Sequence, residues 1–255
     1  MCLVVVALDV HPRFSLVIAA NRDEYHARPA APAAWGRAAP FAGILAGRDL
    51  SAGGTWFGVR RDGRWGLVTN FREGQPKSPE APSRGDLVPQ VLNAADLDQA
   101  LAAIHAERMN YNGYSLLAGS IARAAYASNR AEPKAPLAAG LHGLSNAALD
   151  APWPKLVRAR QALARWIDAR GDDPEPLFAA LADRRKALDA ALPATGVTIE
   201  WERTLSAPFI VGETYGTRCS TVLTIDREGR AEFRERSFDA AGAANGEIVE
   251  SFTLG

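Results

Sequence analysis

Residues 1–8 read MCLVVVAL and residues 14–24 read FSLVIAANRDE, and these two stretches decide the fold of the chain. Both begin with apolar, largely β-branched runs that favour strands, at residues 3–8 and 14–20. The residues between them, DVHPR at 9–13, contain the Asp and Pro that are typical of turns. We therefore predict an antiparallel hairpin, in which the end of the second strand returns to lie beside Cys2.

Cys2 directly follows Met1. If Met1 is removed, a thiol and a free α-amine share one residue. An α-amine titrates at about 7.7–8.0 and a free thiol at about 8.5, so the amine can take the proton of the sulfur near neutral pH. This pattern predicts a nucleophile that carries its own base. The alternative is that Cys2 is a small buried hydrophobe at the start of a strand.

The second strand ends in four polar residues, at 21–24. Because an unpaired buried charge is costly, we expect Arg22 and Asp23 to be partnered and to face a site. A guanidinium near a thiol stabilises the thiolate and lowers its pKa, so Arg22 would activate Cys2. The alternative is a surface loop that carries a solvated ion pair.

Further elements follow from the pattern of apolar and turn-forming residues. We expect strands at 55–60, 64–70, 114–118, 208–211, 218–225 and 230–238, and helices that start at Ser83, cover 152–170 and cover 173–191. Residues 28–40 and 74–82 are rich in Pro and are predicted loops. The order of these elements predicts an α+β fold, and the length fits one domain over residues 1–255.

The chain carries 29 basic and 29 acidic residues, so its net charge is zero and no basic surface indicates nucleic acid. No apolar run approaches the ~20 residues that cross a bilayer, and the amino terminus lacks the pattern of a signal peptide. Two cysteines cannot form a disulfide framework, and the four histidines show no metal-binding spacing. We expect a cytoplasmic, reduced protein without a transmembrane segment, a metal or a cofactor.

Seven short motifs follow one another along the chain. They are Met1-Cys2, Asn21-Arg22-Asp23-Glu24, Gly53-Gly54-Thr55-Trp56, Leu67-Val68-Thr69-Asn70, Ser83-Arg84-Gly85, Gly143-Leu144-Ser145-Asn146 and Tyr215-Gly216-Thr217-Arg218. In this order the chain resembles the NRDE family, whose animal members are called transport and Golgi organisation protein 2. The resemblance implies a four-layer αββα sandwich of the N-terminal-nucleophile hydrolase type, near the choloylglycine hydrolases and penicillin V acylases.

The resemblance also implies roles for residues. In the choloylglycine group, an Asn after a Gly-Leu strand helps to hold the oxyanion, and Asn70 matches that place; Asn146 matches the second Asn of the group less closely. Either Asn could instead cap a turn. The candidate catalytic set is Cys2, Arg22, Asp23, Asn70, Asn146 and Arg218.

Strand alternation bears on the second cysteine. If Arg218 and Ser220 point into the site, Cys219 and Thr221 point away from it. Cys219 is therefore expected to be a small core residue. Many relatives carry Ser there, and strand geometry argues against a disulfide between Cys2 and Cys219.

Two hypotheses on function remain open. The first is a hydrolase or acyltransferase in which Cys2 attacks the amide or thioester carbonyl of a small acylated substrate, while Asn70 and Asn146 bind the oxyanion. The second is a non-catalytic carrier of haem or acyl-lipid that uses the same pocket. The sequence leaves the substrate and the oligomeric state undetermined.

Overall fold

The computed structural model describes residues 2–74 and 78–255. They divide into two compact units. The first unit consists of residues 1–27, 138–145 and 149–252, and the second of residues 28–137, 146–148 and 253–255. The single domain expected over residues 1–255 stays a prediction.

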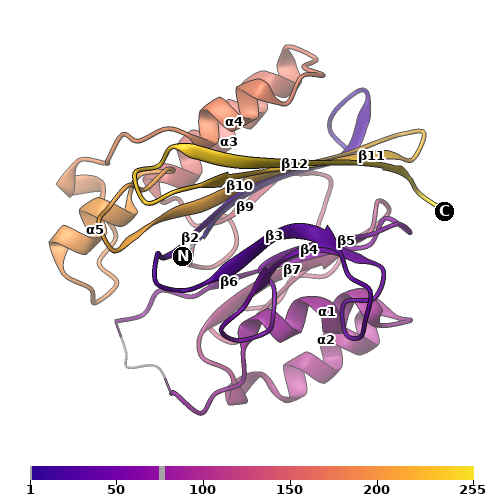
Figure 1. Ribbon diagram of the computed structural model, residues 1–255, viewed down its shortest axis with the longest axis horizontal. Coiled ribbons are helices and arrows are strands. Elements are labelled where there is room, and N and C mark those ends of the chain that lie inside the picture. The colour runs from indigo at the N-terminus through magenta and orange to yellow at the C-terminus, as the bar shows by residue number, and fades with distance from the viewer. Residues whose placement is uncertain (1, 75–77) are drawn as a thin grey trace. The chain divides into compact units, whose positions relative to one another are not determined.

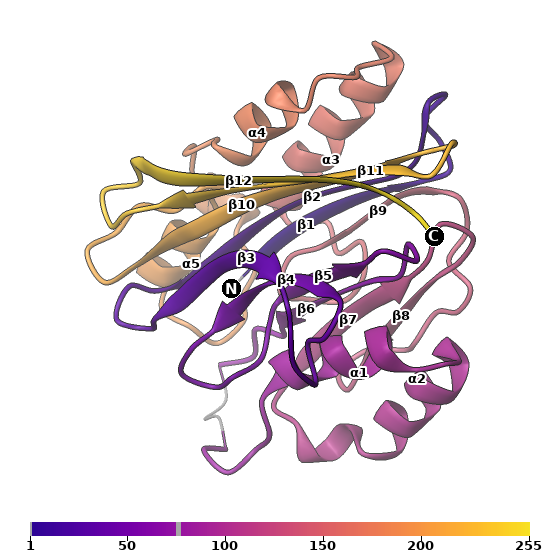
Figure 2. The ribbon, with the colours of Figure 1, turned by 45° about the vertical axis from the view of Figure 1, so that its right-hand side comes forward.

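A six-stranded antiparallel sheet forms the centre of the first unit, in the order β12-β11-β10-β2-β1-β9 (Figure 2). Its strands are β1 (Cys2–Leu8), β2 (Phe14–Tyr25), β9 (Gly140–Leu144), β10 (Tyr215–Asp226), β11 (Arg230–Phe238) and β12 (Ala244–Thr253). The predicted hairpin is confirmed, because β1 pairs with β2 from Cys2 opposite Arg22 to Leu8 opposite Leu16. Strand β2 continues through the polar residues 21–24.

Helices α3 (Pro154–Asp168) and α4 (Glu175–Leu181) cover one face of this sheet (Figure 1). A third helix, α5 (Ile199–Leu205), and a 3-10 turn, η3 (Asp189–Ala191), follow them in the chain. Leu156 and Leu163 of α3 pack with Leu3 and Val5 of β1 in one apolar core. This core fixes α3 against the strand that begins with Cys2.

Strand β10 contains a β-bulge opposite the end of β2. Thr217 pairs with Asp23 and Cys219 pairs with Arg22, so Arg218 is an extra residue without a partner in β2. A bulge of this kind shifts the alternation of side chains along the strand. Thr217 and Ser220 therefore share one face of the sheet, although they are three residues apart.

The second unit contains another six-stranded antiparallel sheet, in the order β3-β4-β5-β6-β7-β8. Its strands are β3 (Ala30–Trp35), β4 (Ile44–Asp49), β5 (Phe57–Arg60), β6 (Trp65–Asn70), β7 (Tyr114–Gly119) and β8 (Ala124–Ser128). Helices α1 (Leu87–Asn93) and α2 (Leu97–Ala106) pack on one face of it (Figure 1). Two 3-10 turns, η1 (Arg84–Asp86) and η2 (Arg108–Asn110), precede α1 and β7.

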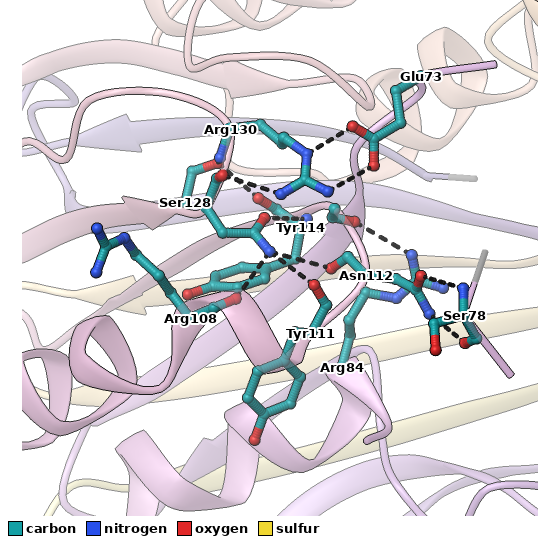
Figure 3. A network of polar contacts seen from close by, with 11 residues as sticks. Glu73, Ser78, Arg84, Arg108, Tyr111, Asn112, Tyr114, Ser128 and Arg130 are labelled. Carbon is teal, nitrogen blue, oxygen red and sulfur yellow. Dashed lines mark hydrogen bonds and ion pairs between the residues drawn. The ribbon is translucent and has the colours of Figure 1, made fainter. Parts of the chain in front are cut away.

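A polar network holds the loop that enters β7 (Figure 3). The side-chain amide of Asn129 donates to the carbonyls of Arg108 and Tyr111, at 3.0 and 2.9 Å, and its oxygen accepts from the Tyr114 N–H. Arg84 donates to the carbonyl of Gly113 at 3.1 Å. The Arg84 of the predicted motif at 83–85 therefore anchors this loop.

Several predicted elements are confirmed, among them β6, β7, α3 and β11. The predicted loop at 28–40 is wrong, since residues 30–35 form β3. Pro32 lies in that strand where its pairing with β4 shifts register, between Ala31 and Ala34. Edge strands and bulges are the places in a sheet that tolerate Pro. The predicted loop at 74–82 lies in part outside the described residues.

Two other predictions are wrong at the far end of α4. The expected helix over 173–191 stops at Leu181, where the chain turns away, because the carbonyl of Asp183 accepts the Phe209 N–H and its carboxylate accepts the Arg185 N–H. Residues 208–211 form no strand. The N–H of Ile210 donates to the hydroxyl of Thr217 instead.

The helix expected at Ser83 begins with the 3-10 turn η1. Ser83 accepts the N–H of Gly85, whereas Asp86 makes no side-chain cap at the start of α1.

His11 in the β1–β2 turn should make the stability depend on pH. Its Nδ1 accepts the N–H groups of Arg13 and Phe14, both at 3.1 Å, and its ring stacks on Trp166. Burial lowers the pKa of His11 below its ordinary value. The unfolded chain then binds a proton more readily than the folded one, so stability is full above about pH 6.5 and falls as the pH drops below it.

The variant His11→Asn offers an acceptor that does not titrate. We expect its free energy of unfolding to fall less between pH 7 and pH 5 than that of the parent, measured by urea denaturation. Equal pH dependence in the two proteins would contradict this role of His11.

Gly54 should not tolerate a side chain. A Cβ there would lie 2.6 Å from the carbonyl carbon of Gly85, and the adjacent Thr55 N–H donates to the Gly85 carbonyl at 3.1 Å. Because backbone cannot rotate away, we expect Gly54→Ala to lower the free energy of unfolding by roughly 1–3 kcal/mol. Gly246→Ala is the control, since its Cβ would meet Ser237 at 3.9 Å, and denaturant titration of both variants checks the difference.

Candidate functional site

The β1–β2–β10 register brings two predicted site residues and a second cysteine together. Arg22 on β2 lies directly opposite Cys2 on β1 and directly opposite Cys219 on β10. Arg22 is 5% exposed, and Cys2 is half-buried. The guanidinium therefore belongs to the interior of the structure and not to a solvated loop.

Competing effects act on the Cys2 thiol. Burial raises the pKa of Cys2 above its ordinary value, and the Asp23 carboxylate raises it further. Arg22 and the backbone N–H of Asp23, which donates to the sulfur, lower the pKa but do not offset these effects. The direction expected for Arg22 is thus present, but it is too small to leave a thiolate at neutral pH.

Asp23 lies on the face of the sheet that α3 and α4 cover. Its Oδ1 accepts the hydroxyl of Thr217 at 2.7 Å, and its Oδ2 lies 3.8 Å from the Nζ of Lys155 on α3. The side chains of Asp23 and Lys155 are 0% and 1% exposed. The hydroxyl of Tyr215 also donates to the Asp23 carbonyl at 3.0 Å. Asp23 is held by groups from two elements.

Asn21 lies on the same face, and its side chain holds β2 through three hydrogen bonds. Its Nδ2 donates to the carbonyls of Leu181 and Pro208, both at 2.9 Å, and its Oδ1 accepts the hydroxyl of Ser220 at 2.6 Å. Because consecutive strand residues alternate, Arg22 leaves β2 on the opposite face from Asn21 and Asp23. Asn21 and Asp23 therefore point to the face that α3 and α4 cover, and Arg22 points to the other face of the sheet.

Arg218 is the extra residue of the β10 bulge. Its guanidinium donates to the carbonyls of Tyr25 and His26, both at 3.2 Å. These carbonyls lie at the end of β2, so Arg218 ties that end to β10. This contact gives Arg218 a structural function beside the catalytic role that the resemblance implies.

The predicted orientation of Cys219 is wrong. Cys219 was expected to point away from the site, but it shares a face with Arg22, and both Cys2 and Arg22 influence its pKa. The bulge at Arg218 is the physical reason, because it shifts the alternation on which that expectation depended. Cys2 and Cys219 are both free thiols, separated by the intervening strand β2.

Glu235 on β11 is a buried carboxylate beside Cys219. It is 1% exposed, accepts the hydroxyl of Thr221 at 3.2 Å and is hydrogen-bonded to the Cys219 thiol. Burial and the Glu235 charge raise the pKa of Cys219 well above its ordinary value. Cys219 is therefore a protonated thiol at neutral pH.

Asn70 and Asn146 meet in the second unit. The Nδ2 of Asn146 donates to the carbonyl of Asn70 at 3.0 Å, and the Asn146 carbonyl accepts the Arg72 N–H at 2.7 Å. Asn146 is fully buried and has a φ of 62°, a conformation that Asn adopts more readily than most residues. One N–H of the Asn146 amide is thus committed to holding the end of β6, where Asn70 stands.

Sequence reasoning missed Lys155 and Glu235. Lys155 carries a charge on the apolar stripe of α3, four residues before the buried Ala159, and a charge in such a place is a usable signal. Glu235 gives a comparable signal, because it follows Ala231 and Phe233 at alternate positions on the buried side of β11. Its burial depends on the pairing with β10.

A family model described as "Transport and Golgi organisation 2" matches residues 1–240. The chain belongs to this family. The Transport and Golgi organization 2 homolog of Mus musculus is 32% identical over 262 residues, and the match covers 93% of each chain. The homolog of Homo sapiens is also 32% identical, with the same coverage of each chain. The resemblance stated from the seven motifs is confirmed.

A solved structure shows the fold. The family member described here is similar to a Caenorhabditis elegans N-acylethanolamine-hydrolyzing acid amidase ortholog, with a TM-score of 0.54 and 14% identity. The likeness covers 87% of this chain and 92% of that one. It confirms the predicted α+β fold of the N-terminal-nucleophile hydrolase type.

Two features of the described residues bear on membranes and metals. In residues 2–74 and 78–255, none of the helices has the length and apolar character needed to span a membrane. Within the same ranges, His, Cys, Asp and Glu side chains form no group of three that could hold a metal ion. The predictions on metal and cofactor stay predictions.

Proposed function

We propose that this family member is a cytoplasmic cysteine amidohydrolase or acyltransferase with Cys2 as its nucleophile. The observation that carries the proposal is the position of Cys2 at the first residue of β1, directly opposite Arg22 and hydrogen-bonded to the backbone of Asp23. The N-terminal-nucleophile fold supports it. Both cysteines are free thiols, which fits the reducing compartment expected from the sequence.

The proposed reaction requires removal of Met1. The α-amine of Cys2 then takes the thiol proton, and the sulfur attacks the carbonyl carbon of an acyl amide or thioester. The tetrahedral intermediate collapses, the leaving amine or thiol takes the proton, and an acyl-enzyme thioester remains. Water, or an acceptor amine in a transferase, attacks this thioester and regenerates the thiol.

The other candidate residues have supporting roles in the proposal. Arg22 balances negative charge at the sulfur, since it already lowers the pKa of Cys2. Asp23 orients the amino terminus, and Asn70 and Asn146 are the oxyanion donors that the resemblance implies. Arg218 completes the proposed set. The substrate class is a small acyl amide or thioester, and the proposal includes no resident cofactor.

The test compares processed protein with a variant that lacks the thiol. Mass spectrometry first establishes that Met1 is absent. A panel of acyl amides and thioesters is then offered to the parent and to Cys2→Ala. We expect turnover by the parent alone, and loss of turnover when the amine is blocked by an added amino-terminal residue. Absence of Cys2-dependent turnover, with saturable haem binding that Cys2→Ala abolishes, would replace this proposal with a carrier.

A further inference from the structure

A buried lysine lies behind the proposed nucleophile. Lys155 is in the first turn of α3, and its ammonium is 3.8 Å from the carboxylate of Asp23. Both side chains are within 1% of complete burial. A buried lysine is costly unless a charge compensates it, so Lys155 at this place indicates a function that depends on its charge.

Asp23 is also the link to Cys2. Its backbone N–H donates to the sulfur, and its carboxylate is close enough to affect the thiol. An uncompensated carboxylate here would keep the sulfur protonated. It would also stabilise an adjacent α-ammonium, the form of the amine that cannot act as a base. The Lys155 ammonium, 3.8 Å from the Asp23 carboxylate, opposes both the protonation of the thiol and the stabilisation of the α-ammonium.

We propose that Lys155 is a positioning residue that neutralises the Asp23 carboxylate, so that the thiol and the amine of Cys2 can exchange a proton near neutral pH. This inference rests on the proposed function. It adds a residue of α3 to a site otherwise built from strand ends. Lys155 touches no reacting atom and acts through Asp23.

Other charged groups surround this pair on the neighbouring elements. Strand β2 contributes Arg22 beside Cys2, and β10 and β11 contribute Cys219 and Glu235 beyond it. On the helix side, the ionic pairs join Arg158 to Asp183, Arg160 to Asp150 and His142 to Asp150. These pairs keep their charges in every variant below except the control.

The experiment measures how fast Cys2 is alkylated by iodoacetamide between pH 6 and pH 10. A Cys219→Ser background leaves Cys2 as the one thiol of the 255-residue chain. We expect Lys155→Met to raise the midpoint of the pH profile by roughly 0.5–1 unit, because the thiolate loses a nearby compensating cation. Asp23→Asn should lower the midpoint, since it removes the anion and leaves the cation.

The double variant Asp23→Asn/Lys155→Met decides whether Lys155 acts through Asp23. If Lys155 acts through the carboxylate, Lys155→Met has no further effect once that carboxylate is gone, so the midpoint of the double variant should equal that of Asp23→Asn. Lys155→Arg keeps the charge and should leave the midpoint unchanged. Arg158→Met, three residues along α3, removes a cation from the partly buried pair with Asp183 and is the control for net charge.

Shifts of the midpoint in opposite directions in the two single variants, with the double variant equal to Asp23→Asn, would support the proposal. A midpoint unchanged in Lys155→Met, or shifted equally in Arg158→Met, would overturn it. If Lys155→Met does not fold, the double variant and Lys155→Arg decide. A double variant whose midpoint differs from that of Asp23→Asn, or a shifted midpoint in Lys155→Arg, would overturn the proposal. If the midpoints shift as expected but no turnover depends on Cys2, the proposed function is wrong, and the effect of Lys155 and Asp23 on the Cys2 thiol still holds.

Discussion

Asn70→Ala is expected to lower the turnover of an acyl amide by about 10²–10³-fold and to leave substrate affinity nearly unchanged. The reason is that acyl transfer builds negative charge on the carbonyl oxygen, and an amide N–H stabilises that charge in the transition state. The carbonyl of Asn70 is already held by Asn146 at 3.0 Å, so the backbone at this position is fixed before substrate binds. Steady-state kinetics on processed protein gives kcat and KM separately.

Two further variants make this result specific. Asn70→Asp keeps the size of the side chain but removes its N–H donors, and it should lose at least as much turnover. Asn93→Ala removes an exposed amide from the end of α1 and should leave kcat unchanged. A kcat for Asn70→Ala within about threefold of the parent would remove Asn70 from the proposed oxyanion site.

Leu156→Ala is expected to lower the free energy of unfolding by about 2–5 kcal/mol. Leu156 is fully buried and belongs to the core between α3 and the strands β1 and β2. It packs so closely on β9 that a Cβ on Gly143 would lie 2.4 Å from its Cδ1. Truncation leaves a cavity that this backbone cannot fill.

The neighbouring residue supplies the control. Val157 is 37% exposed, on the other side of the same helix turn, and Val157→Ala should change the stability by no more than about 0.5 kcal/mol. Urea denaturation followed by circular dichroism measures both variants. Equal losses in the two would show that α3 does not bury the face described here.

The sequence predicted the hairpin of β1 and β2 because both strands carry strong local signals. It did not predict that β2 would continue to Tyr25, since the polar residues at its end look like a loop until their partners are known. Asn21 and Asp23 are acceptable in a strand because α4 and α3 supply a carbonyl and a lysine to them. Those partners are about 130 to 160 residues away in the sequence, beyond the reach of any local pattern.

The candidate site could also be predicted only in part. Cys2 and Arg22 follow from the hairpin, and the structure pairs them directly. The face of Cys219 could not be derived, because a β-bulge is a property of two paired strands and leaves little trace in one of them. Pro32 shows the same limit, since only the pairing of β3 and β4 reveals that it occupies an irregular place in an edge strand.

Strand β10 should tolerate a change of residue at Arg218 better than a change of length. Thr217 and Ser220 reach Asp23 and Asn21 on the same face of the sheet only because an unpaired residue lies between them. Any side chain at that place preserves the spacing. Deleting the residue would force one of the two contacts to the opposite face, because a slip of one position inverts every side chain along a strand. A substitution at Arg218 should therefore keep the pairing of β10 with β2, whereas a deletion in this segment should disrupt it.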